Sequence, residues 1–188
     1  AATCRRGERC LYLAFEESPA QVTRNMRSIG IDLESLMKQG LLQFRASRPT
    51  QHGLEMHLLE IHKVVEQFNP SVVIVDPITN LISTGDENEV KSMLMRLIDF
   101  LKHRQITALF TSLTAAGSPA EQTEVGISSL IDTWILFREI EAEGERNRGL
   151  YVVKSRGMAH SNQIREFMLT ANGVKLVPPY LGMGTVLT

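Results

Sequence analysis

The run Val72–Asp76, "VVIVD", limits the fold more than any other segment. Four consecutive β-branched residues with no polar alternation are typical of a strand that is buried on both faces of a parallel sheet. Parallel neighbours must be joined by long crossovers, which are usually helices. The run therefore predicts a chain in which strands and helices alternate. Further strands are expected at "RCLYLAF" (9–15), "LLQFRAS" (41–47) and "TALFTSL" (107–113).

Amphipathic helices are predicted between these strands. Ser18, Pro19 and Gln21 form a strong helix start, and Asp86 with Glu89 forms another. Apolar residues at helical spacing mark the buried stripe of a long helix that Asn69-Pro70 ends: Leu54, Leu58, Ile61, Val65 and Phe68. Strands and helices in this order predict right-handed βαβ units and a parallel sheet.

The rhythm changes after residue 132, where strands follow one another without helices. These are "TWILFREIE", "GLYVVKSRG", "REFMLTA" and "GVKLVP", with a hairpin turn at "TANGV". We expect them to form an antiparallel extension of the same sheet. The prediction is a single α/β domain over residues 1–188, with a mainly parallel twisted sheet flanked by helices.

Composition excludes few classes of protein but favours a globular one. Apolar residues make up 43% of the chain and charged residues 22%, and the net charge is −1. This balance does not favour broad electrostatic binding to nucleic acid or to an anionic membrane. The chain holds two cysteines without zinc spacing, no bilayer-length apolar stretch and no signal peptide, so we expect a cytoplasmic protein.

Polar side chains follow three of the predicted strands: Glu16 and Glu17, Asp76, and Thr111 with Ser112. In open α/β sheets, ligands bind beyond the carboxyl ends of the strands. Asp76 fits a Walker B carboxylate that holds Mg²⁺, and a nearby glutamate could orient water for attack on a phosphoryl group. Thr111 and Ser112 would suit a sensor of the phosphate. The plainer alternatives are that Asp76 begins an Asp-Pro turn, that the glutamates cap a helix dipole or are solvated, and that the hydroxyls are incidental.

The segment "YVVKSRGMAH" is a candidate polyanion clamp. Strand alternation places Lys154 and Arg156 on one face, ahead of a turn at Gly157 and of His160. An exposed sheet face would show the same pattern. His52, His57 and His62 recur every five residues, which does not suit a helical metal site, so we interpret them as ordinary surface or boundary histidines.

Taken in order, these segments resemble the KaiC family of RecA-like P-loop ATPases over essentially the whole chain. The resemblance is carried by "LAFEES", "VVIVDPIT", "ALFTSLT", "IDTWILFREIE", "VVKSRGMAH" and "IREFMLTANG". It implies a homo-oligomeric ring, a hexamer in the family, with ATP and Mg²⁺ bound between protomers. Glu16 and Glu17 then match the catalytic pair, and Asp76 matches the Walker B aspartate. Lys154, Arg156 and His160 match a basic segment that reaches the neighbouring subunit's nucleotide.

The resemblance also bears on Ser128 and Ser129 in "GISSLIDT". They align with a Ser-Thr pair that one half of KaiC phosphorylates on itself, so serine/threonine autokinase activity is one interpretation. Here the pair is Ser-Ser, and small polar residues before a strand more often only shape a loop, which is the interpretation we favour. We expect a regulatory or signalling role and leave circadian timing open, because many family members share this core.

One element of the family pattern is missing: the 188 residues contain no GxxxxGK[ST] loop. That loop supplies most of the grip on phosphate. We expect a chain that is incomplete at its N-terminus, preceded by the loop and the first strand of the fold, and inactive alone. One alternative is a non-catalytic regulatory scaffold. A DNA-binding recombinase is less favoured, because "AAGSPAEQTEVG" holds no Lys or Arg.

Overall fold

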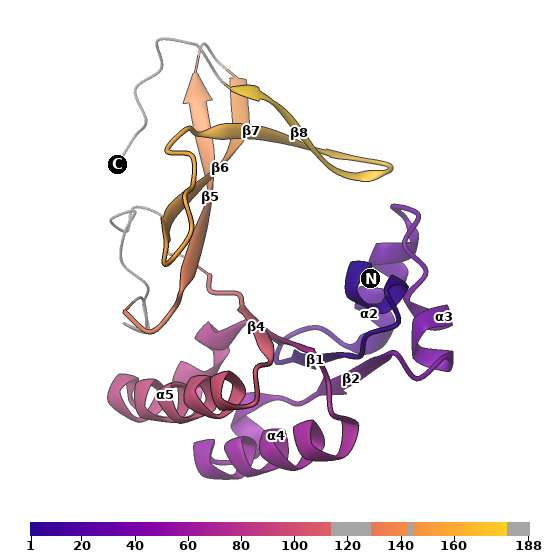
Figure 1. Cartoon of the computed structure of the whole chain (residues 1–188), viewed down its shortest axis with the longest axis vertical. Coiled ribbons are helices and arrows are strands. Elements are labelled where there is room, and N and C mark those ends of the chain that lie inside the picture. Colours follow the sequence, from indigo (N-terminus) through magenta and orange to yellow (C-terminus); the bar gives the residue numbers. More distant parts are fainter. Residues whose placement is uncertain (114–128, 143–144, 180–188) are drawn as a thin grey trace. The chain divides into compact units, whose positions relative to one another are not determined.

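The computed structural model describes residues 1–113, 129–142 and 145–179 of the chain. The backbone forms two compact units, with residues 1–113 in the first and residues 129–142 and 145–179 in the second. The prediction of a single domain stays a prediction. The first unit contains helices and a parallel sheet, and the second contains an antiparallel sheet (Figure 1).

The first unit is built on a four-stranded parallel sheet in the order β2-β1-β3-β4. Its strands are β1 (Cys10–Ala14), β2 (Leu42–Ala46), β3 (Val72–Asp76) and β4 (Thr107–Phe110). Its helices are α1 (Ala2–Arg5), α2 (Pro19–Arg27), α3 (Leu33–Lys38), α4 (Leu54–Phe68) and α5 (Glu87–His103), with 3₁₀ turns η1 (Pro49–Gln51) and η2 (Ile78–Ser83). This confirms the predicted alternation of strands and helices.

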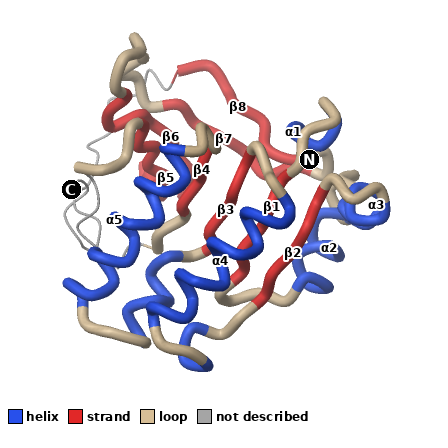
Figure 2. The backbone as a smooth tube through the Cα atoms, turned by 60° about the horizontal axis from the view of Figure 1, so that its bottom comes forward, coloured by secondary structure: helices blue, strands red, loops and turns tan. Residues whose placement is uncertain are grey.

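Helices cover the two faces of this sheet in pairs. Figure 2 shows α4 and α5 on one face, while α2 and α3 lie beside β2. On the α2 and α3 side, Cys10 and Leu42 pack in one apolar cluster with Val22 and Leu33. Strand alternation sends the next residues to the opposite face, where Leu11, Val73 and Val75 are completely buried. β3 is thus packed on both faces, as its apolar run predicts.

Local capping signals set the helix ends. The Ser18 hydroxyl accepts a hydrogen bond from the Gln21 N–H at 3.3 Å, and the Gln21 side chain accepts one from the Ser18 N–H at 3.0 Å. Asp86 and Glu89 form the same reciprocal pair at the start of α5. Asn69 ends α4 in the left-handed conformation, with φ of 47°. The sequence predicted each of these ends because capping depends only on residues within one turn.

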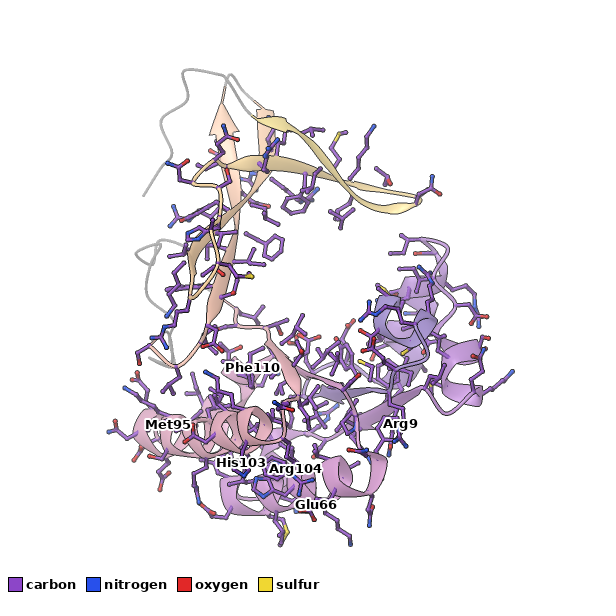
Figure 3. The ribbon with its side chains drawn as sticks, in the orientation of Figure 1. Arg9, Glu66, Met95, His103, Arg104 and Phe110 are labelled. Atoms are coloured by element: carbon purple, nitrogen blue, oxygen red, sulfur yellow. The ribbon has the colours of Figure 1, made fainter. Side chains whose placement is uncertain are left out.

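Side chains also connect α4 to α5. Arg104 donates to Glu66 at 2.7 Å, and the two side chains lie together between the helices in Figure 3. Arg96 of α5 forms an ion pair with Glu55 in the first turn of α4. These pairs are exposed and are worth little on their own. The apolar stripe of α5 contributes much more, because six of its residues are buried against the sheet and α4: Val90, Met93, Leu94, Leu97, Ile98 and Leu101.

The second unit is an antiparallel sheet in the order β5-β6-β7-β8. Its strands are β5 (Thr133–Ala142), β6 (Glu145–Ser155), β7 (Arg165–Thr170) and β8 (Gly173–Pro179). Thr170 pairs with Gly173, so the predicted "TANGV" turn closes the last hairpin. Antiparallel strands were predicted correctly, but they form a sheet of their own. Among the described strands no pairing joins β4 to β5, which differs from the extension that we expected.

None of the described helices combines the length with the apolar character that crossing a bilayer requires.

Core packing gives a stability prediction for α5. Leu97→Ala should lower the free energy of unfolding by roughly 2–5 kcal/mol, because Leu97 is fully buried and its removal leaves a cavity. Leu59→Ala is the matched control, since Leu59 is 62% exposed on α4 and its loss should cost less than about 0.5 kcal/mol. Urea unfolding followed by circular dichroism measures both. Equal losses in the two variants would contradict this account of the core.

Candidate functional site

The candidate site lies where the chain connections of the parallel sheet diverge. From β1 the chain crosses to β2 through α2 and α3, whereas from β3 it crosses to β4 through α5 on the other face. β1 and β3 are neighbours, so these connections diverge from adjacent carboxyl ends at one edge of the sheet. This is the position at which open α/β sheets bind ligands.

The parallel register brings the predicted acids to this edge of the sheet. Ala14 is paired with Asp76, and the Phe15 N–H donates to the Asp76 carbonyl oxygen at 2.8 Å. Glu16 and Glu17 follow directly, so all three carboxylates belong to one edge of the sheet. Asn80 secures the turn, because its side-chain amide donates to the Phe15 carbonyl oxygen at 3.4 Å. The structure thus brings together the two acidic segments that the sequence singled out.

Two hydroxyl groups hold the half-buried Asp76 carboxylate. The Tyr12 hydroxyl donates to Oδ2, and the Thr111 hydroxyl donates to Oδ1. Tyr12 lies on β1 and Thr111 directly follows β4, so the donors come from the strands on either side of β3. Tyr12 was not among the residues predicted for the site. Tyr12 lies two residues before the register partner of Asp76, and this relation is known only once the strands have been paired.

The surroundings of Tyr12 keep its hydroxyl protonated, so it remains a hydrogen-bond donor. Burial is the largest cause that raises the pKa of Tyr12 above its usual range, followed by its hydrogen bond to Asp76 and the negative charges of Asp76 and Glu17. The contribution of Glu17 places this carboxylate within electrostatic reach of the Tyr12–Asp76 pair. Glu17 also accepts a hydrogen bond from the Asn25 side chain of α2 at 3.5 Å. Glu16 and Glu17 are both exposed and are accessible to a bound molecule.

The predicted hydroxyl sensors differ from each other. Thr111 is bound to Asp76, so its hydroxyl serves the carboxylate in this structure. Ser112 is half-buried, and its hydroxyl donates a long 3.5 Å hydrogen bond to the Leu113 carbonyl oxygen. The two residues were predicted to be equivalent, because strand alternation alone does not show which hydroxyl bonds to the Asp76 carboxylate.

The predicted polyanion clamp lies in the antiparallel unit, and its relation to Asp76 stays a prediction. Lys154 is a half-buried residue of β6, whereas Arg156 follows the end of this strand and is exposed. The Arg156 guanidinium donates to the Ser129 carbonyl oxygen at 2.6 Å, and the Arg156 backbone N–H donates to the Asp132 carbonyl oxygen at 2.8 Å. His160 is exposed, with Nδ1 3.4 Å from the Met158 carbonyl oxygen.

The two serines considered for phosphorylation are placed differently. Ser129 is described and exposed, and its carbonyl oxygen accepts the bond from Arg156. Ser128 lies outside the described residues. The proposed modification of either residue therefore stays a prediction.

The residues at this edge of the sheet suit a hard cation that is shared with a bound phosphate. Within the described ranges no group of three or more His, Cys, Asp or Glu side chains could enclose a metal ion. Mg²⁺ does not need such a cage, because it keeps several waters and commonly uses one or two carboxylates plus substrate phosphates. Asp76 supplies a hydrogen-bonded carboxylate of this kind, and the two side chains that bond to it also present oxygen atoms, as hydroxyl groups. These residues therefore fit Mg²⁺.

Comparison with known proteins gives the family. A sequence model of the KaiC ATPase family matches residues 1–180. The chain belongs to the KaiC family. "Circadian clock protein KaiC2" of Synechocystis sp. is 57% identical over 189 residues, which covers the whole chain and 33% of that protein. "Circadian clock oscillator protein KaiC" of Picosynechococcus sp. is 36% identical over 174 residues, covering 92% of the chain and 34% of that protein.

These findings confirm the resemblance and the RecA-like α/β fold that it implies. "Circadian clock protein KaiC3" of Synechocystis sp. is 35% identical over 96% of the chain and 36% of its own length. The chain therefore spans about a third of the length of the curated KaiC relatives that it matches.

A separate pocket of 530 Å³ lies on the α4 side of this KaiC chain. It is lined by Leu13 and Phe15 of the β1 segment, Arg45 of β2 and His57 and Glu60 of α4, among others. Over the described residues, its lining includes none of the predicted nucleotide-site residues. His57 also corrects the expectation of surface or boundary histidines: it is 2% exposed, and its Nε2 lies 2.8 Å from the Pro49 carbonyl oxygen.

The Tyr12 environment predicts a distinctive pH response. Tyr12 should remain protonated at about pH 11, whereas an ordinary tyrosine ionises near pH 10. Its folded-state pKa is raised, so this contribution to stability is complete below about pH 10 and is lost as the pH rises through the folded pKa. As the pH is raised to about 11, the absorbance at about 295 nm should increase equally in native wild type and native Tyr12→Phe. In denaturant, the increase should be smaller for the variant by the contribution of one tyrosine. A smaller native signal in Tyr12→Phe would contradict the assignment.

Proposed function

We propose that this KaiC domain binds and hydrolyses ATP in a homo-oligomeric ring, with a hexamer as the expected form. The observation that carries the proposal is the paired register of β1 and β3, which brings Glu16-Glu17 and Asp76 to one edge of the sheet. Membership of the KaiC ATPase family supports the choice of nucleotide. The names of the relatives connect them with circadian timing, so a regulatory role is the natural setting for this activity.

Each acidic residue has a distinct role in this proposal. Asp76 would hold Mg²⁺, directly or through water, and the bound ion would neutralise charge that develops on the phosphates. Glu16 or Glu17 would orient the attacking water and accept its proton. Orientation contributes much of the rate, because a correctly placed water avoids the entropy cost of a bimolecular encounter.

The basic residues would act across a subunit boundary. Lys154, Arg156 and His160 would approach the nucleotide of the neighbouring protomer and stabilise negative charge on its phosphates. For this role, the Arg156 guanidinium would have to leave the Ser129 carbonyl oxygen or divide its five N–H donors between that oxygen and the phosphates. The chain spans about a third of the length of its relatives, so the activity is proposed for the full-length protein.

Substitution of the acids tests the proposal. In full-length protein, Glu16→Gln/Glu17→Gln should lower ATP turnover by about 100-fold or more, because both candidate bases lose their charge while keeping their shape. Glu34→Gln is the matched control: Glu34 is exposed on α3, in a surface pair with Arg27, and its loss should leave turnover unchanged. Nucleotide binding by the variants, measured separately, shows whether the site is still occupied.

The outcomes separate the main proposal from its rival. Turnover by Glu16→Gln/Glu17→Gln equal to wild type would remove the proposed role of the glutamates. A full-length wild type that binds partners but neither binds nor hydrolyses ATP would favour the non-catalytic scaffold.

A further inference from the structure

The Asp76 carboxylate receives one hydroxyl bond on each oxygen, from Tyr12 at Oδ2 and from Thr111 at Oδ1. Each carboxylate oxygen has two lone-pair directions, so among the described residues one direction on each oxygen stays open. The two donors are neutral and leave the negative charge of the group in place. What they restrict is its rotation, because a carboxylate that is held from both ends has one preferred plane.

The position of the Tyr12 hydroxyl is set by the core and not by Asp76. Its ring packs against Phe44 of β2, with the centroids 5.0 Å apart and a tilt of 36°. The ring also belongs to the apolar cluster that contains Cys10, Val22 and Leu42. A tyrosine hydroxyl moves only with its ring, so this packing makes Tyr12 a fixed donor.

The backbone on either side of Thr111 is fixed as well. Its N–H donates to the Val75 carbonyl oxygen at 3.1 Å, and its carbonyl oxygen accepts from the Ile78 N–H at 2.9 Å. These bonds continue the β3–β4 pairing one residue beyond the strand. The Thr111 hydroxyl therefore meets Asp76 from a backbone that is itself attached to β3 and to the start of η2.

We propose that Tyr12 and Thr111 are positioning residues that set how Asp76 holds the metal ion of the bound nucleotide. The inference rests on the proposed function in one respect, namely that Asp76 holds Mg²⁺. Mg²⁺ demands nearly octahedral geometry, so a carboxylate or a carboxylate-bound water must meet it in a narrow range of orientations. Partners that orient a metal-binding residue typically change affinity or activity by 10–100-fold when they are lost.

Metal binding by full-length protein tests this directly, with Mn²⁺ as the probe for Mg²⁺ and a non-hydrolysable ATP analogue present. The electron paramagnetic resonance signal of free Mn²⁺ gives the affinity without any turnover. Tyr12→Phe and Thr111→Val should each weaken Mn²⁺ binding by about 10-fold, since each removes one hydroxyl and keeps the packing shape. Tyr151→Phe makes the same chemical change in β6 and should leave the affinity within twofold of wild type.

Turnover supplies a second readout. The Mg²⁺ concentration that gives half-maximal ATP hydrolysis should rise by a similar factor in both variants, while the rate at saturating Mg²⁺ changes much less. Thr111→Ser, which keeps a hydroxyl, should restore the affinity lost in Thr111→Val. Thermal unfolding of each variant shows whether the chain is folded, and if Tyr12→Phe does not fold, the two Thr111 variants decide the matter.

Two results would overturn the proposal, and they are distinguishable. If Asp76→Asn weakens Mn²⁺ binding but Tyr12→Phe and Thr111→Val stay within twofold of wild type, the hydroxyls are structural and the proposed function stands. If Asp76→Asn also leaves Mn²⁺ binding unchanged, the metal role of Asp76 is wrong and this inference is wrong with it.

Discussion

The parallel pairing of β1 with β3 is the constraint on which the candidate site depends. It sets Ala14 opposite Asp76, and the Phe15 N–H extends the pairing by one hydrogen bond to the Asp76 carbonyl oxygen. A shift of one residue would send the side chains of a strand to the opposite face of the sheet. The register is well specified here because both faces of β3 are packed, with Val73 and Val75 completely buried on one of them.

The same packing supports the polar groups at the edge of the sheet. Burial around Tyr12 favours its neutral form, so the residue stays a hydrogen-bond donor beside a carboxylate. A charged donor in this position would neutralise Asp76 and make it a poorer ligand for a cation. Two neutral hydroxyls orient the carboxylate and leave its charge available. The apolar cluster of α2, α3, β1 and β2 thus connects core packing with the chemistry proposed for Asp76.

Much of the fold could be predicted because its signals are local. The capping pairs at Ser18 and Asp86 involve residues within one helical turn, and the β3 run is visible as a continuous apolar segment. The acids of the candidate site could also be predicted, because residues that follow parallel strands share one edge of the sheet. Family membership, confirmed over residues 1–180, agrees with this order of elements.

Contacts between distant residues could not be predicted in this way. The Tyr12–Asp76 bond joins residues 64 positions apart, and its existence depends on register and on ring packing. The burial of His57 depends on the η1 turn that supplies its carbonyl partner. The separation of the strands into two sheets was likewise invisible, since strand patterns do not state which edges pair. The sequence by itself determined the elements, their order and the acids at the strand ends, because these follow from neighbouring residues. Only the tertiary structure decided which hydroxyls hold Asp76, because that choice depends on distances across the sheet.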